Sequence, residues 1–327
     1  MIVSRRRLVK TLVFSGLALV AAPRFPALPT EAETEKSLVV QAVSPRLRRN
    51  NHDIPRETAR DYLNRSLQAI TGRHDATAAW RSLFAPEENV GIKVSCLPGR
   101  PLSSSLGLVA AVVDGLLAAG LAEKNITIWE RSSRELEKAG FRISRSGLKI
   151  MGTDEFPDGG YSDHMEFSGS MGTFFSRIME SIDALINVPV LKDHDLAGLS
   201  GAMKNMYGAI YNPNKFHANH CDPFVAELCN HPLIKGKLRL VVCDASRVQV
   251  HNGPAYYPPY AREYGGILVS RDPVALDFAA RGIIDSLRRE MGLPTLAEAG
   301  REPAYIRTAA RLGLGRAAER LIQKVAL

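Results

Sequence analysis

One stretch, Ile186 to Cys221, constrains the fold more than any other part of the sequence. An apolar run from Leu185 to Leu191 ends there in a segment rich in charged and polar side chains. Such a run predicts a strand that is buried on both faces, and open α/β folds bind ligands beyond the carboxyl ends of these strands. The stretch therefore predicts an α/β sheet with a site at its edge. The candidate residues are Lys192, Asp193, His194, Asp195, Lys204, Asn205, His217, His220 and Cys221.

Other apolar runs supply neighbours for this strand. A strand over 89–94, a helix over 105–119 and a strand over 125–129 have the spacing of a right-handed βαβ unit. Further strands are predicted over 238–243 and 267–270, with Asp244 and Asp272 just beyond their ends. We expect a mostly parallel sheet flanked by helices in a single α/β domain over 37–292. Residues 293–327 are basic and alanine-rich, which predicts a helical C-terminal extension.

The basic charge of the chain is concentrated at its N-terminus. Four basic residues, Arg5, Arg6, Arg7 and Lys10, contribute to the formal net charge of +8, and no basic stripe interleaved with aromatics follows. We therefore expect no nucleic-acid partner. Residues 1–32 match a twin-arginine export signal and linker, which predicts passage through the twin-arginine translocase to the periplasm. The apolar run Thr11 to Ala22 is shorter than the roughly 20 residues that span a bilayer, so no permanent membrane anchor is expected.

The cysteine pattern limits the cofactors that we expect. Four cysteines are too few for a disulfide framework, and no CxxC spacing indicates an iron–sulfur cluster or a zinc ribbon. Cys96 and Cys243 each follow an apolar run and could pair, although a buried free cysteine is the commoner outcome. Neither a GxGxxG after a predicted strand nor a P-loop is present, so neither NAD nor ATP is expected.

Three lysines lie beside apolar segments. Lys93, Lys192 and Lys204 would form an anion pocket if they converge on one edge of the sheet, and a helix opening near Leu199 would add its N-terminal dipole. The alternative is that each lysine pairs with a carboxylate such as Asp193, Asp195 or Asp244. For one lysine alone the paired interpretation is favoured, whereas for Lys192 and Lys204 together the two interpretations carry equal weight.

A second group could hold a divalent metal. His217, His220 and Cys221, followed by Asp222, offer imidazole, thiolate and carboxylate ligands of the kind that zinc prefers. The preceding Asn-Pro-Asn sequence indicates a turn, and the alternative is that the histidines bond backbone carbonyls. Residues 252–266, rich in tyrosine and proline, predict an ordered loop near a cleft.

The motifs together carry a family resemblance. The sequences INVPVLKDHDLAGLSGAMKNMYGAI, KFHANHCDP, LVVCDA and GGILVSRDPVALD resemble the bacterial and archaeal family catalogued as domain of unknown function 362. The resemblance implies an α/β fold. Some relatives carry a ferredoxin-like segment with clustered cysteines, which this chain lacks. The implied site residues are Lys93, Lys192, His194, Lys204, Asn205, Asp272 and Asp277.

These observations predict an exported enzyme that acts on a small anionic substrate in a lysine- and histidine-lined pocket at the sheet edge. The alternative is a periplasmic protein that binds an anion or a metal without catalysis. The expected catalytic residues are Lys192, His194, Lys204 and Asn205. The expected substrate-binding residues are Lys93, Asp244, Asp272 and Asp277. The expected metal ligands are His217, His220 and Cys221.

Overall fold

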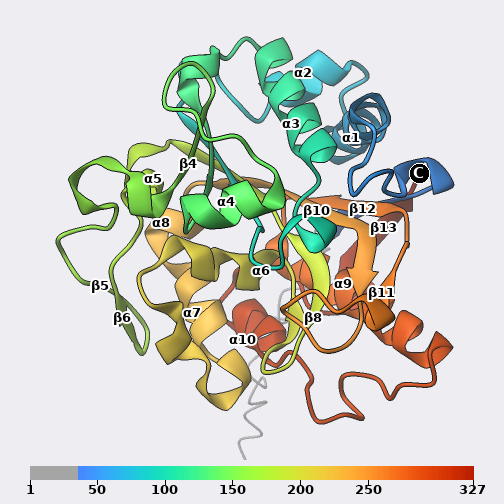
Figure 1. Ribbon diagram of the computed structural model, residues 1–327. Coiled ribbons are helices and arrows are strands. Elements are labelled where there is room, and N and C mark those ends of the chain that lie inside the picture. The colour runs from blue at the N-terminus through green and yellow to red at the C-terminus, as the bar shows by residue number, and fades with distance from the viewer. Residues whose placement is uncertain (1–35) are drawn as a thin grey trace, which may run out of the picture. The chain divides into compact units, whose positions relative to one another are not determined.

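Apolar strand runs assemble into one large mixed sheet in the computed structural model, which describes residues 36–327 (Figure 1). The strand order is β13-β1-β12-β10-β7-β2-β3-β4, with β8, β9 and β11 attached through β10, and β5 and β6 form a separate hairpin. The strands are β1 Ser37–Val43, β2 Val90–Val94, β3 Ile126–Glu130, β4 Lys149–Gly152, β5 Glu166–Ser168, β6 Met171–Thr173, β7 Ala184–Val188, β8 Val190–His194, β9 Gly198–Ser200, β10 Leu238–Gln249, β11 Ala261–Arg262, β12 Gly266–Ser270 and β13 Ile322–Ala326.

Parallel pairing dominates the half of the sheet that carries the site. The strands β10, β7, β2, β3 and β4 run parallel to one another, whereas β12 is antiparallel to both β1 and β10. All five residues of β2 and all five of β7 are buried, as expected for central strands covered on both faces. The predicted α/β class with a mostly parallel sheet and flanking helices is confirmed.

Helices cover both faces of the sheet, and each face has its own apolar core. Helices α1 to α4 pack on one face around Trp80 and Leu116, and α6, α7, α9 and α10 pack on the other around Met203 and Tyr305 (Figure 1). The helices are α1 Arg56–Thr71, α2 Ala76–Arg81, α3 Leu106–Ala119, α4 Ser133–Ala139, α5 Arg177–Ser181, α6 Ala202–Asn205, α7 Phe224–Asn230, α8 Pro232–Lys235, α9 Pro273–Glu290 and α10 Tyr305–Arg311.

Pro189 divides the strand predicted from the central apolar run. β7 ends at Val188, and β8 begins at Val190. Both strands pair with β10, but β8 has the antiparallel β9 on its other side where β7 has β2. A proline has no N–H to donate to a ladder, so an unbroken central strand could not pass through this position. The break directs β8 away from β2 and carries Lys192 and His194 to the edge of the sheet.

Three further expectations differ from the structure. The segment near Leu199 is a strand rather than a helix start, since α6 begins only at Ala202. Asp244 lies within β10, which continues to Gln249. The C-terminal extension contains one α-helix, α10, but its last residues form β13, which pairs with β1 at the sheet edge.

The N-terminal signal predicted over residues 1–32 lies outside the described residues. From residue 36 onward, no helix is long and apolar enough to cross a membrane. All four cysteines are free and buried, so Cys96 and Cys243 do not form the disulfide that their positions would have allowed.

Candidate functional site

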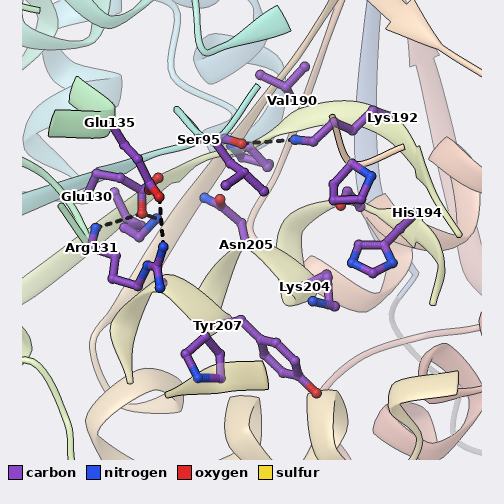
Figure 2. A pocket seen from close by; sticks show the side chains of 18 of the residues that line it. Ser95, Glu130, Arg131, Glu135, Val190, Lys192, His194, Lys204, Asn205 and Tyr207 are labelled. Carbon is purple, nitrogen blue, oxygen red and sulfur yellow. Dashed lines mark hydrogen bonds and ion pairs between the residues drawn. The ribbon is translucent and has the colours of Figure 1, made fainter. Parts of the chain in front are cut away.

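A cavity of about 330 Å³ opens where β2, β3 and β8 end (Figure 2). Its lining combines the polar ends of these strands with helix α6 and the turn that follows it. The lining includes all four residues that the sequence predicted as catalytic, together with Lys93 and His217. The residues that line it are Lys93, Ser95, Leu97, Glu130, Arg131, Glu135, Pro189, Val190, Lys192, His194, Ser200, Gly201, Lys204, Asn205, Tyr207, Gly208, Pro213, Asn214, His217 and Pro254.

Lys93 forms an ion pair with Glu130 in the lining of the cavity. Its Nζ lies 2.7 Å from Glu130 Oε1 and donates to the carbonyl of Val94 at 2.7 Å. Gly208 leaves the space that this pair needs, because a Cβ there would lie 2.7 Å from Lys93 Nζ and 2.6 Å from the carboxylate. The paired interpretation therefore holds for Lys93, with Glu130 as its partner, and its substrate-binding role stays a prediction.

Lys192 and Lys204 are different, because neither forms an ion pair with a carboxylate within residues 36–327. Both side chains are buried, with 4% and 7% of each residue exposed. Lys192 Nζ donates to Ser95 Oγ at 3.0 Å, and Lys204 Nζ lies 3.2 Å from His217 Nε2 and 3.8 Å from the centre of the Tyr207 ring. The two amines thus face the cavity with only uncharged partners.

Burial without a counter-charge makes both amines easier to deprotonate. Desolvation lowers the pKa of Lys192 to about 8, although the nearby Glu130 acts in the opposite direction. Desolvation also lowers the pKa of Lys204 to about 8, and the charge of Lys192 adds to this effect. Near neutral pH, each lysine can therefore exist in both protonation states.

His194 is held in one tautomer by the backbone. Its Nδ1 accepts hydrogen bonds from the N–H groups of Leu196 and Ala197, both at 3.2 Å, so the proton of the neutral ring is on Nε2. Desolvation, reinforced by the charge of Lys204, holds the pKa of His194 well below its ordinary value. His194 is therefore a hydrogen-bond donor in the cavity, and its role as an acid or base stays a prediction.

His217 has the opposite tautomer. Its Nδ1 lies 3.1 Å from the carbonyl oxygen of Pro213, to which it donates, so Nε2 accepts from Lys204. The rings of His194 and His217 stack with their centroids 5.5 Å apart. The turn therefore holds Lys204 through a neutral imidazole.

A chain of amides fixes the orientation of Asn205. Asn187 donates to the carbonyl of Ala202, and Asn205 Nδ2 in turn donates to Asn187 Oδ1, each at 2.7 Å. This bond fixes the orientation of the Asn205 amide, and within residues 36–327 its carbonyl oxygen has no hydrogen-bond partner and is available to a ligand. Asn205 thus offers an acceptor at a place otherwise occupied by donors.

Asp277 anchors helix α6 and does not line the cavity. Its carboxylate accepts from the N–H groups of Ala202 at 2.6 Å and Met203 at 3.0 Å, so it occupies the helix N-terminus where an anion was expected. This contact requires Gly201, because a Cβ there would lie 2.1 Å from the carboxylate. Burial raises the pKa of Asp277 to about 7.

The other two predicted substrate-binding carboxylates are also structural. Asp272 caps helix α9 through the N–H groups of Val274 and Ala275 and accepts from Ser37, far from the cavity. Asp244 pairs with Arg49 at 2.9 Å, and both side chains are fully buried. Neither residue is among those that line the cavity, and their substrate-binding role stays a prediction.

The structure does not gather His217, His220 and Cys221 into a metal site. His220 Nδ1 bonds the carbonyl of Leu196 at 3.0 Å and Cys221 is fully buried, whereas His217 lines the cavity. The group of potential ligands found within residues 36–327 is Asp193, Asp195 and His251. Arg301 pairs with both of those aspartates, at 3.0 and 3.6 Å, and a cation would meet its positive charge.

Three residues of the site were missed in the sequence. Ser95 holds Lys192, Glu130 neutralises Lys93, and Tyr207 lies under the ammonium group of Lys204. Ser95 and Glu130 stand at the ends of β2 and β3, so the rule that drew attention to Lys192 would also have found them. Tyr207 carried no such signal, because aromatic residues in a glycine-rich turn are common.

The chain was also compared with known proteins and protein families. The model of a family described as a domain of unknown function (DUF362) matches residues 90–282, which include β2, β8 and α6. No curated protein matches the chain.

Two solved structures are similar to the chain. A crystal structure of a Thermotoga maritima protein, determined as a structural genomics target, is 11% identical with a TM-score of 0.44, covering 73% of this chain and 60% of that chain. The lactate racemase apoprotein from Thermoanaerobacterium thermosaccharolyticum is 12% identical with a TM-score of 0.44, covering 80% of this chain and 60% of that chain. The chain thus matches 60% of the length of each.

Proposed function

The chain belongs to the DUF362 family, and from this premise we propose that it is an enzyme that acts on a small anionic substrate in the cavity of Lys192 and Lys204. One observation carries the proposal. Four of the charged side chains in the lining neutralise one another, Lys93 with Glu130 and Arg131 with Glu135, and the two remaining amines have no carboxylate partner within residues 36–327.

The energetics favour an anion as the missing partner. Removing an ammonium group from water costs several kcal/mol, and an opposite charge within hydrogen-bond distance offsets this cost. A cavity of about 330 Å³ lies at the lower end of the range for small-molecule sites. The Nε2 donor of His194 adds to the attraction for an anion, and the carbonyl oxygen of Asn205 would orient a hydroxyl group of the same ligand.

The presence of lysine rather than arginine at these two positions supports catalysis over simple binding. An arginine would hold an anion with a permanent charge, whereas a buried lysine can lose its proton near neutral pH. With pKa values lowered by burial to about 8, Lys192 and Lys204 can give or take a proton during a reaction. His194 would remain a donor throughout, since its Nδ1 is held by the backbone.

Titration calorimetry on the full chain with acetate, malonate and phosphate tests the proposal. We expect at least one of these anions to bind, and Lys192→Met or Lys204→Met to weaken that binding about tenfold or more, because each removes a charged hydrogen bond. The matched control is Lys235→Met, an exposed lysine on α8, which should leave the affinity unchanged. Failure of all three anions to bind, or equal affinity in all variants, would contradict an anion site.

The pH dependence of the same titration gives a second readout. Acetate stays ionised from about pH 6 to pH 10, so a change in its affinity reports on the protein. Burial lowers the pKa of both lysines to about 8, and the affinity should therefore be full below this pH and fall as the pH rises through it. If the affinity stayed constant up to about pH 10, the ordinary pKa of lysine, it would contradict the assignment of these two lysines as the anion-binding groups.

We also propose that the enzyme acts in the periplasm after export by the twin-arginine translocase. The proposal is supported by Arg5, Arg6 and Arg7 before the apolar run. In cell fractionation, the native chain should appear in the periplasm, and a chain with all three arginines changed to lysine should stay in the cytoplasm. A native chain found in the cytoplasm would refute export.

A further inference from the structure

We propose that the substrate is a small carboxylate that also carries an aldehyde or ketone group, and that Lys192 forms an imine with this carbonyl. The inference rests on the proposed function and assigns different tasks to the two unpaired amines. Lys204 and His194 would hold the carboxylate, and Lys192 would be the nucleophile.

The contacts of the two lysines support this division. Lys204 lies on the face of Tyr207, whose negative potential favours an ammonium ion, and it donates to the neutral Nε2 of His217. Lys192 touches the hydroxyl of Ser95, which can accept from an amine in either protonation state. Lys204 is therefore held between an aromatic face and an imidazole, whereas the contact of Lys192 is a hydroxyl group.

The strand geometry brings the parts together. Lys192 and His194 are two residues apart on β8, so their side chains leave the same face of the strand. Both line the cavity with Lys204 (Figure 2). A carboxylate on the His194 donor and the Lys204 ammonium would present an adjacent carbonyl carbon to the Lys192 amine.

The reaction needs no further reagent. The neutral amine of Lys192 attacks the carbonyl carbon, a C–N bond forms, and a proton passes from nitrogen to the former carbonyl oxygen. The nitrogen lone pair of the resulting carbinolamine then forms the C=N bond and expels the hydroxyl group, which takes the second proton of the nitrogen and leaves as water, so that a neutral imine remains. Burial, which lowers the pKa of Lys192 to about 8, increases the fraction of neutral amine that begins the reaction.

Reductive trapping tests the proposal. The full chain is incubated with pyruvate and sodium cyanoborohydride, and the labelled lysine is located by peptide mass spectrometry. We expect one reduced pyruvate per chain, attached to Lys192, at pyruvate concentrations that leave the exposed Lys235 unlabelled. Labelling of Lys192 no greater than that of Lys235, or a label on Lys204 instead, would overturn the proposal.

Variants separate this inference from the anion site itself. Lys192→Arg keeps a cation but removes the nucleophile, so trapping should be lost while pyruvate still binds in calorimetry. Lys192→Met provides a second variant without an amine. If pyruvate binds to the native chain but is never trapped, imine formation is refuted and the anion site stands. If pyruvate, acetate, malonate and phosphate all fail to bind, both proposals fall.

Discussion

The Lys192→Met and Lys204→Met variants are expected to be more stable than the native chain in the absence of an added anion. Each native lysine buries an amine without a carboxylate partner in the described part of the chain, and methionine fills a similar volume with no charge to desolvate. We expect each change to raise the free energy of unfolding by about 1–3 kcal/mol at neutral pH. Urea unfolding of the full chain measures this difference.

The matched control for this experiment is Lys93→Met. Lys93 comes from the same cavity and is equally buried, but its removal leaves the carboxylate of Glu130 buried without its cation. The free energy of unfolding of this variant should be lower than that of the native chain by about 3–5 kcal/mol. If Lys192→Met and Lys204→Met lost as much stability as Lys93→Met, the two lysines would stabilise the fold rather than serve a ligand. The proposed function would then lose its main support.

Asp244→Ala is expected to destabilise the chain by about 3–5 kcal/mol, because it removes one partner of a buried ion pair. The carboxylate of Asp244 accepts from Arg49 at 2.9 Å and from the backbone of Ser105 at 2.9 Å and Ser246 at 3.0 Å. It therefore joins the segment before α1 and the start of α3 to the centre of β10. Chemical denaturation measures the loss.

Asp195→Ala is the comparison for Asp244→Ala. Its side chain is 59% exposed and meets Arg301 at 3.6 Å, so its removal should change stability by less than about 1 kcal/mol. Equal losses in the two variants would show that burial of the Arg49–Asp244 pair has no special effect. Anion binding should be unchanged in both folded variants, since neither aspartate lines the cavity.

The elements that could be predicted from the sequence are those with a strong local signal. The strands over 89–94 and 267–270 are apolar runs, and Asp272 with Pro273 marks the start of α9. The break at Pro189 was missed because the apolar run continues through it, although the proline itself was visible. Helix α6 began later than expected, because Asp277 supplies its capping carboxylate from 75 residues further along the chain.

Some properties of the site could likewise be predicted from the sequence, and others could not. The residues that end strands were found because the rule that places ligands there is local. Which lysine is paired could not be predicted, because Lys93 and Lys192 look alike in sequence and differ only in whether a carboxylate such as Glu130 lies opposite. The tautomer of His194 depends on two backbone N–H groups in the following turn, and the sequence does not show their direction.

Crystals of the full chain grown or soaked with sodium bromide test the central claim most directly, because bromide can be located by its anomalous scattering. We expect a bromide peak inside the cavity within hydrogen-bond distance of Lys192 Nζ or Lys204 Nζ, and the loss of this peak in the Lys192→Met, Lys204→Met double variant. Bromide found only on the outer surface, with either amine turned to pair with a carboxylate, would contradict the proposed anion site.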